Sequence, residues 1–315
     1  MRHRRLVAAL IFSSCLLSLP LFAAAKEKPT PTTKELLATS GPAEWRKPDP
    51  QNLMVMQLST GRVLIELAQE FSPLHADNIR TLVRQHYFDG LAIIRVQDNF
   101  VTQWGDPNDN DNGDKSQIRS LGKASSTLLP EFSRAIDPKR SWTPLPDGDV
   151  YAPQVGFSGG FPVGRDPASG REWPAHCYGM VGVARDVDPR SGSGSSLYAV
   201  IGSARKLDHN LAIAGRVLEG MPLLSSLPRG SEPMGFYDKP AQRLAIISVR
   251  IAADMAGKER PNIEVLRTNS PTFAAIINLR RNGHDAFYPE PVGKIGLCSI
   301  EAPVREIGNA ARKTH

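Results

Sequence analysis

Beyond its first 25 residues, the 315-residue sequence has no long hydrophobic run, no Lys/Arg run with interleaved aromatic residues, and no cluster of metal ligands or phosphate-binding glycine loop. The first absence predicts that the mature chain has no membrane span, because a spanning helix needs about 18 or more consecutive apolar residues. The second argues against a nucleic-acid partner, whose phosphates call for a basic patch. The third leaves no metal site and no cofactor to expect.

Charge of one sign is also lacking, since 38 Lys and Arg stand against 32 Asp and Glu and the net charge is +6. With 41% hydrophobic and 22% charged residues, the composition is ordinary for a globular protein and excludes disorder and a fibrous repeat. The length allows one large domain with appendages or two modest ones.

Residues 1–25 are predicted to be a secretory signal peptide. Three arginines precede an apolar run over residues 6–22, and the small residues Ala23-Ala24-Ala25 favour cleavage after Ala25. Cleavage would lower the net charge from +6 to +3, because the segment holds three arginines and no acid. We therefore expect a soluble protein that is exported, to the periplasm. Lipid attachment at Cys15 is the less favoured alternative, since this cysteine lies early in the apolar stretch.

The mature chain would keep two cysteines, Cys177 and Cys298, in a compartment that permits oxidation. An even pair suggests a disulfide, which would close a loop of about 120 residues. The alternative is two small buried thiols, and the sequence leaves both open.

The pattern over residues 52–253 favours a β-barrel with two helices over alternating βαβ units. A hairpin is predicted at 53–67, where apolar residues alternate before a Ser-Thr-Gly turn. Ser72 and Pro73 have the pattern of an N-cap followed by proline at the first helical position. Further strands are predicted over residues 91–96, 178–184, 197–201, 211–217 and 244–251, and a short helix over 219–227.

A long insertion rich in proline and glycine interrupts this pattern at residues 138–175. Irregular segments of this length are uncommon unless they are functional or mobile. The insertion contains a G-x-S-x-G pattern at 156–160, but Pro162 and Gly164 prevent the helix that follows the serine of a hydrolase. A serine hydrolase is therefore disfavoured.

Two further segments flank the predicted barrel. Residues 26–51 show no sustained hydrophobic period and are predicted to form a linker or a loosely attached arm. The C-terminal extension, residues 254–315, has a predicted helix with Ser270 as N-cap and a stop at Asn282-Gly283. We expect the apolar stripe of this helix to dock on the barrel.

Several blocks of the sequence resemble the signature of cyclophilin-type peptidyl-prolyl isomerases. The central block comprises Tyr87-Phe88-Asp89-Gly90, Arg95-Val96, Asn99-Phe100-Val101, Gln103 and Gly105-Asp106. Others follow in the family's order and spacing at Ser72–Ile79, Gly179–Ala184, Gly194-Ser195, Leu207-Asp208 and Gly215–Met221. Ordered agreement over about 200 residues is more specific than any one short motif. The resemblance implies a closed eight-stranded antiparallel barrel capped by two helices, with a filled interior and a binding groove on the outside.

Arg95 is the candidate catalytic residue. Rotation about an X–Pro bond is slow because amide resonance gives the C–N bond double-bond character, with a barrier of about 18–20 kcal/mol. A fixed guanidinium that donates toward the twisted prolyl amide would localise the lone pair on the prolyl nitrogen and lower this barrier without a proton transfer. The alternative is a structural arginine that pairs with a buried acid or covers apolar surface.

The resemblance also implies the roles of the other site residues. Positions at which the family builds its apolar proline pocket are occupied by Phe100, Val101, Tyr198 and Leu207. Positions that bind the backbone of the substrate, in part by pairing with it as an extended strand, are occupied by Gln103, Ala184 and Arg185.

Four positions depart from the family's pattern. Lys206 replaces a pocket-edge tryptophan often associated with cyclosporin binding, and it predicts weak inhibition by that drug. Leu211 replaces a histidine and keeps the pocket wall apolar, and Ser196 replaces a glutamine; both stay among the expected substrate-binding residues. Trp104 stands where glycine is usual, and it would misplace Gln103 if the glycine's backbone conformation were essential.

The expected function is isomerisation of X–Pro bonds in unfolded or folding exported proteins, carried out by a monomer. Two alternatives stay open. One is a peptide-binding chaperone or assembly module that keeps the barrel and has lost most activity. The other is a lipocalin-like carrier, which would need a hollow barrel.

Overall fold

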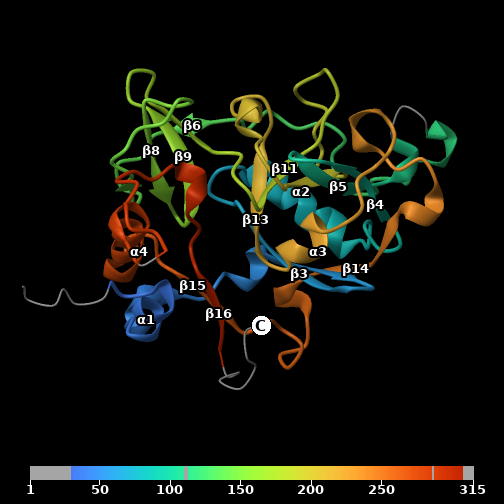
Figure 1. The fold of residues 1–315 in the computed structure, drawn as a ribbon. Helices are drawn as coiled ribbons and strands as arrows, with labels where there is room; N and C mark the ends of the chain where they lie inside the picture. Colours follow the sequence, from blue (N-terminus) through green and yellow to red (C-terminus); the bar gives the residue numbers. More distant parts are fainter. Residues whose placement is uncertain (1–29, 110–112, 286, 308–315) are drawn as a thin grey trace, which may run out of the picture.

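The computed structural model describes residues 30–109, 113–285 and 287–307. Eight strands form a closed antiparallel barrel in the order β11-β12-β5-β4-β14-β2-β3-β13, which confirms the expected fold (Figure 1). The strands are β2 (Leu53–Leu58), β3 (Gly61–Leu67), β4 (Ala92–Gln97), β5 (Val101–Gly105), β11 (Met180–Val183), β12 (Leu197–Val200), β13 (Ile213–Glu219) and β14 (Leu244–Ile251). The predicted signal peptide, residues 1–25, lies outside the described residues.

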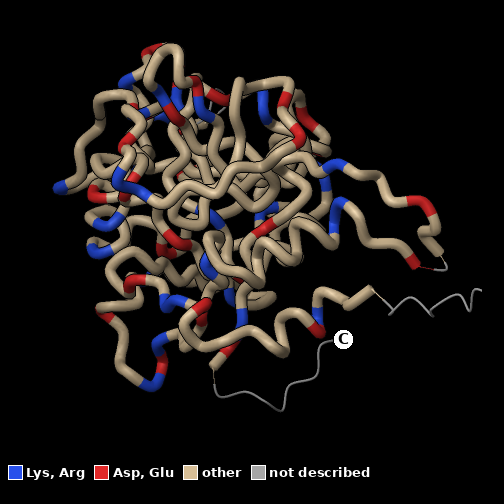
Figure 2. The backbone as a smooth tube through the Cα atoms, turned by 90° about the vertical axis from the view of Figure 1, so that its left-hand side faces the viewer, with Lys and Arg blue, Asp and Glu red and all other residues tan. Residues whose placement is uncertain are grey.

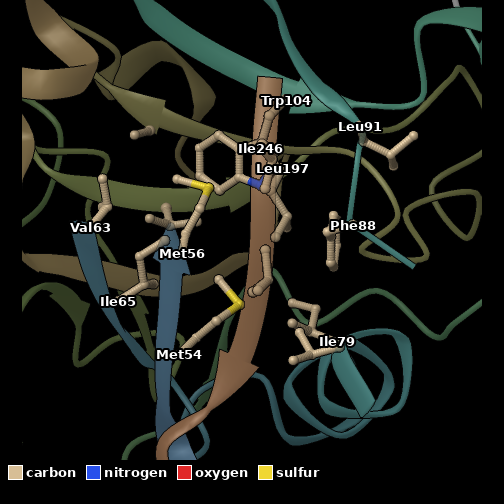
Figure 3. Close-up of a cluster of buried hydrophobic side chains, with 14 of the residues drawn as sticks. Met54, Met56, Val63, Ile65, Ile79, Phe88, Leu91, Trp104, Leu197 and Ile246 are labelled. Atoms are coloured by element: carbon tan, nitrogen blue, oxygen red, sulfur yellow. The ribbon is translucent and has the colours of Figure 1, made fainter. Parts of the chain in front are cut away.

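Side chains fill the interior of the barrel. Successive side chains of a strand point to opposite faces of the sheet, so one face of every strand contributes to this core. Met56, Val63, Ile65 and Trp104 belong to it, and each is at most 1% exposed (Figure 3). A carrier of small apolar ligands would need this space to be open, so the filled interior argues against that alternative.

Helices α2 (Pro73–Arg84) and α3 (Met221–Ser225) cap the barrel. Helix α2 buries Ile79 and Leu82 against the barrel core, and α3 buries Leu224 in the same cluster. Pro73 stands at the first position of α2, as the sequence predicts.

The N-terminus of α2 is capped differently from the prediction. The Ser72 hydroxyl donates to the carbonyl of Ile213 (2.8 Å) and makes no capping bond. The carboxylate of Glu131 instead accepts from the backbone N–H groups of Leu74 (3.1 Å) and His75 (3.0 Å). A carboxylate at this end of a helix also interacts favourably with the helix dipole, which makes Glu131 the stronger cap.

The described part of the N-terminal arm carries regular structure, which differs from the expectation of a loose linker over residues 26–51. Helix α1 spans Thr33–Ala38, and β1 (Trp45–Arg46) pairs with β15 (Ile263–Leu266). Trp45 is 5% exposed, and its Nε1 donates to Ser40 Oγ (2.8 Å). A six-residue helix and a two-residue strand are too short to show a hydrophobic period, so the sequence pattern could not reveal them.

The insertion, residues 138–175, is predicted to be irregular, but together with β6 just before it the insertion forms a five-stranded sheet in the order β6-β10-β9-β8-β7. Its strands are β6 (Arg134–Ala135), β7 (Thr143–Pro144), β8 (Gln154–Ser158), β9 (Phe161–Asp166) and β10 (Arg171–Pro174). Pro144 lies on the edge strand β7, where a missing N–H is tolerated. Ser158 is buried at the end of β8, and the chain turns into β9 rather than a helix, so it does not form a nucleophile elbow.

The C-terminal extension contacts both the barrel and the insertion sheet. Ile263 on β15 packs with Leu53 and Val55 of β2, and β16 (Val304–Glu306) pairs with β15. Helix α4 (Pro271–Asn282) starts at the predicted N-cap Ser270, and its Phe273 packs edge-on against Phe157 of β8 with ring centroids 5.1 Å apart. The helix expected to dock on the barrel thus packs on the insertion sheet, beside α1 (Figure 1).

A disulfide joins Cys177 to Cys298 and decides the question that the sequence left open. It ties the C-terminal extension to the segment that enters β11.

Lys and Arg are interspersed with Asp and Glu along the described chain (Figure 2). The helices in the described ranges include no candidate for a bilayer-spanning segment.

Candidate functional site

A cavity of about 420 Å³ lies on the outer side of β4, β5 and β12. All of the residues that the sequence assigns to the site line it, namely Arg95, Phe100, Val101, Gln103, Ala184, Arg185, Ser196, Tyr198, Leu207 and Leu211. Residues far apart in the chain therefore meet in one place, because neighbouring strands of the barrel present their outward faces together.

The alternation of β5 explains why Trp104 is compatible with the site. Thr102 and Trp104 point into the barrel, where Trp104 is buried in the core, while Val101 and Gln103 point outward into the cavity. Gln103 pairs in register with Tyr198 of β12 and with Arg95 of β4. The barrel core accommodates the Trp104 side chain, so Trp104 does not displace Gln103 from the cavity.

A β-bulge in β4 aims Arg95 at the cavity. The register with β5 shifts between Ile93 and Arg95, and both Ile94 and Arg95 line the cavity while Ile93 and Val96 lie in the core. A bulge of this kind re-aims a side chain without ending the strand. Arg95 is 8% exposed.

Three neutral acceptors hold the Arg95 guanidinium. Nε donates to the carbonyl of Met234 (2.6 Å), Nη1 donates to Gln103 Oε1 (3.1 Å), and Nη2 donates to Gln97 Oε1. Within the described residues, Arg95 forms no ion pair. Burial lowers the pKa of Arg95, but an arginine stays a cation at neutral pH.

The Gln103 side chain is oriented from both ends. Its Oε1 accepts from Arg95, and its Nε2 donates to Ser196 Oγ (3.0 Å). Ser196, which replaces a glutamine of the family pattern, therefore serves as the acceptor that holds the Gln103 amide.

Phe100, Val101, Tyr198, Leu207 and Leu211 form the apolar part of the cavity. The Tyr198 hydroxyl is bonded to buried His176 (2.9 Å), which does not line the cavity. Burial raises the pKa of this hydroxyl well above its ordinary value, so it stays protonated. The tyrosine therefore presents its ring to the cavity, while its hydroxyl is hydrogen-bonded to His176.

Ala184 and Arg185 lie along the cavity with part of their hydrogen-bonding capacity already used. The Ala184 N–H donates to the carbonyl of Ser196 (3.0 Å). Arg185 donates through Nε to the carbonyl of Asn210 (3.1 Å) and through Nη1 to that of Asp186 (2.6 Å). The Arg185 side chain is thus a fixed part of the rim.

Several lining residues were not found from the sequence. Met234 and Phe236 come from a segment before β14 that packs over Arg95, whose guanidinium carbon lies 5.3 Å from the Phe236 ring centroid. The residues around them gave no periodic signal.

Asp106, Asp109 and Asp186 add acidic groups to one part of the lining, and burial is the main cause that raises the pKa of Asp109. The described residues hold no group of three His, Cys, Asp or Glu side chains placed to bind a metal ion.

Comparisons with known proteins agree with this geometry. The family model described as cyclophilin type peptidyl-prolyl cis-trans isomerase/CLD matches residues 53–251. A probable peptidyl-prolyl cis-trans isomerase of Brucella suis is 26% identical over 209 residues, which cover 65% of this chain and 85% of that protein. A putative thylakoid lumen peptidyl-prolyl cis-trans isomerase of Synechocystis is 24% identical over 185 residues, 56% of this chain and 44% of that protein.

Among solved structures, the cyclophilin AquaCyp293 from Hirschia baltica is similar, with a TM-score of 0.68 and 28% identity over 87% of this chain and 97% of that one. The family match covers the whole barrel, including the strands that carry the cavity. The chain belongs to the cyclophilin-type peptidyl-prolyl cis-trans isomerase family.

Proposed function

We propose that the protein accelerates X–Pro bond rotation in exported polypeptides, with Arg95 polarising the prolyl amide while the proline ring occupies the apolar part of the cavity. The single observation that carries the proposal is the environment of Arg95. Its guanidinium is fixed beside the apolar part of the cavity by neutral acceptors, and within the described residues it forms no ion pair.

The neutrality of these acceptors matters for catalysis. A carboxylate partner would offset the charge of the guanidinium, whereas carbonyl and amide oxygens leave it almost undiminished. Three of the five N–H groups of Arg95 are used in these bonds, which leaves one on Nη1 and one on Nη2 for a substrate.

The chemistry asked of Arg95 is modest. As the prolyl bond twists, the nitrogen loses conjugation and its lone pair becomes a better hydrogen-bond acceptor, so a fixed donor binds the twisted form more tightly than the planar one. Removing one charged or oriented donor of this type costs about 10²–10³ in rate. The apolar pocket adds binding of the proline ring, and Gln103 and Ala184 offer groups for the neighbouring backbone.

An assay on a short X–Pro peptide tests the proposal. We expect Arg95→Ala to lower kcat/KM by about 10²-fold or more, and Arg95→Lys to restore only part of it, because lysine keeps the charge and loses the planar fork. Arg305→Ala is a suitable control, since Arg305 pairs with Glu264 on the C-terminal sheet. Peptide binding without turnover by the unmodified protein would instead select a binding module.

Export is supported by the pattern of residues 1–25 and by the relative named for the thylakoid lumen. N-terminal sequencing of the protein from a periplasmic fraction should begin at Lys26. Recovery of the full-length chain in the cytoplasm would contradict export.

A further inference from the structure

A line of buried polar contacts runs from the insertion to the proline pocket. Asp149, in the loop between β7 and β8, accepts from both Nη atoms of Arg205 (3.0 and 3.1 Å). Arg205 Nε donates to Asp208 (2.6 Å), Asp208 contacts His176 Nδ1 (3.0 Å), and His176 Nε2 contacts the Tyr198 hydroxyl (2.9 Å). None of these contacts is part of the chemistry proposed for Arg95.

The direction of each hydrogen bond follows from the donors available. Asp208 is an ionised acceptor, because burial raises its pKa less than the interactions with His176 and Arg205 lower it. His176 must therefore donate from Nδ1, and burial keeps this imidazole neutral by lowering its pKa. Nε2 is then an acceptor, so the Tyr198 hydroxyl donates to it.

The contacts restrain two surfaces of the pocket. The bond to His176 orients Tyr198, whose ring lies across β11 where Gly182 leaves room for it. Leu207 stands between Arg205, which Asp149 of the insertion holds, and Asp208, which His176 holds, so this anchoring restrains the apolar wall.

The insertion also packs directly on the same turn. The ring of Trp173 on β10 lies 3.8 Å, centroid to centroid, from that of His209, the residue after Asp208. The turn at residues 205–209 is therefore contacted at three positions. Asp149 binds Arg205, His176 binds Asp208, and Trp173 packs on His209.

We propose that Asp149, from the insertion, and His176, from the chain just after it, are positioning residues for isomerisation that hold Leu207 and Tyr198 in the proline pocket. This inference rests on the proposed function, but it concerns binding of the proline side chain rather than the polarisation of its amide. Loss of either contact should weaken binding of planar and twisted substrate alike, which raises KM more than it lowers kcat.

Asp147 offers a matched control for Asp149. Both side chains are 10% exposed, and each binds an arginine through both carboxylate oxygens, Arg281 for Asp147 and Arg205 for Asp149. Each also accepts from one backbone N–H, that of Ile295 or Tyr151. The partners of Asp147 lie in the C-terminal extension and do not line the cavity.

The experiment measures kcat, KM and the unfolding midpoint of Asp149→Asn and Asp147→Asn on one X–Pro peptide. We expect Asp149→Asn to raise KM by about threefold or more with kcat nearly unchanged, Asp149→Glu to recover part of the loss, and Asp147→Asn to leave KM unchanged at a similar shift in midpoint. Equal KM values for the two Asn variants would overturn the role of Asp149.

A double-mutant cycle addresses His176 and remains informative if an Asp149 variant fails to fold. His176→Gln should raise KM in the natural background and have a much smaller effect in Tyr198→Phe, because the hydroxyl that it positions is then gone. Additive effects, or no effect of His176→Gln on KM, would overturn the inference. Loss of turnover in Arg95→Ala alongside these outcomes would show that the proposed function itself stands.

Discussion

The Lys206 ammonium lies 4.7 Å from the centroid of the Phe100 ring, which lines the cavity. A cation over an aromatic face is attracted by the ring quadrupole, so Lys206 covers part of the Phe100 ring. The tryptophan that Lys206 replaces in the family pattern would instead add apolar surface beside this ring. Arg95 approaches the same ring, with its guanidinium carbon 5.6 Å from the centroid. Phe100 thus lies beside two cations, Arg95, which we assign to catalysis, and Lys206.

Lys206 predicts weak inhibition by cyclosporin. A charged side chain at this position adds little apolar contact to a large apolar ligand, and covering its ammonium would cost hydration free energy. Lys206→Trp should strengthen inhibition by about tenfold or more, because a buried tryptophan is a typical binding hot spot. Titration of the drug in the isomerase assay measures both forms, and nanomolar inhibition of the natural protein would contradict the prediction.

Gly182→Ala should damage the pocket. A Cβ atom at this position would lie 2.2 Å from the Tyr198 hydroxyl oxygen, so the ring or the strand must move. We expect a loss of about 1–3 kcal/mol in the free energy of unfolding, together with weaker peptide binding. Gly257→Ala is the control, since its Cβ meets nothing within 4 Å. Equal behaviour of the two variants in urea unfolding and peptide titration would refute this account.

Reduction of the Cys177–Cys298 disulfide should destabilise the protein. The bond closes a loop with a sequence separation of 121 residues, and the chain-entropy model assigns such a loop about 4–5 kcal/mol. Urea unfolding with and without a thiol reductant measures the loss. A variant with both cysteines replaced by serine should start from the lower stability and show no response to the reductant.

His176 predicts that stability falls as the pH drops below about 6.5. Burial lowers the pKa of His176 from its ordinary value of 6.5, against an opposing contribution from Asp208. Below pH 6.5 the unfolded chain therefore takes up a proton that the folded protein resists, and the free energy of unfolding decreases by at most about 1.4 kcal/mol per pH unit.

Urea unfolding between pH 7.5 and 5.5 tests this dependence. The free energy of unfolding should change less with pH in His176→Gln than in the natural protein. The charged and titratable neighbours of His176 are Asp208, Arg205 and Tyr198, and Asp208 stays ionised throughout this range. An unchanged slope in the variant would assign the dependence to other groups.

Local pattern predicted most strands of the barrel, and the resemblance to the family assigned ten of the residues that line the cavity. Strands such as β4 and β13 carry their apolar runs in the sequence, and Ser270 with Pro271 marks the start of α4 as the structure has it. The site residues could be assigned because the family blocks are contiguous and ordered, so positions such as Arg95 and Gln103 were identifiable before their neighbours were known.

Long-range contacts decided the features that the pattern missed. Glu131 rather than Ser72 caps α2, from 56 positions away from His75, and no local spacing encodes such a pairing. The strands of the insertion sheet are short and interrupted by Pro and Gly, so their order depends on pairing with one another and on Phe273 of α4. Met234 reaches Arg95 through its carbonyl, a group that every residue has.

The amino-acid sequence by itself determined the barrel, its two capping helices and the family, because alternation, helix caps and ordered motifs are local properties of a chain. Only the tertiary structure decided that Cys177 bonds Cys298, that the insertion is a sheet, and that the Tyr198 hydroxyl faces His176. These outcomes depend on which distant segments meet, and burial makes each unpaired polar group costly enough to select one partner.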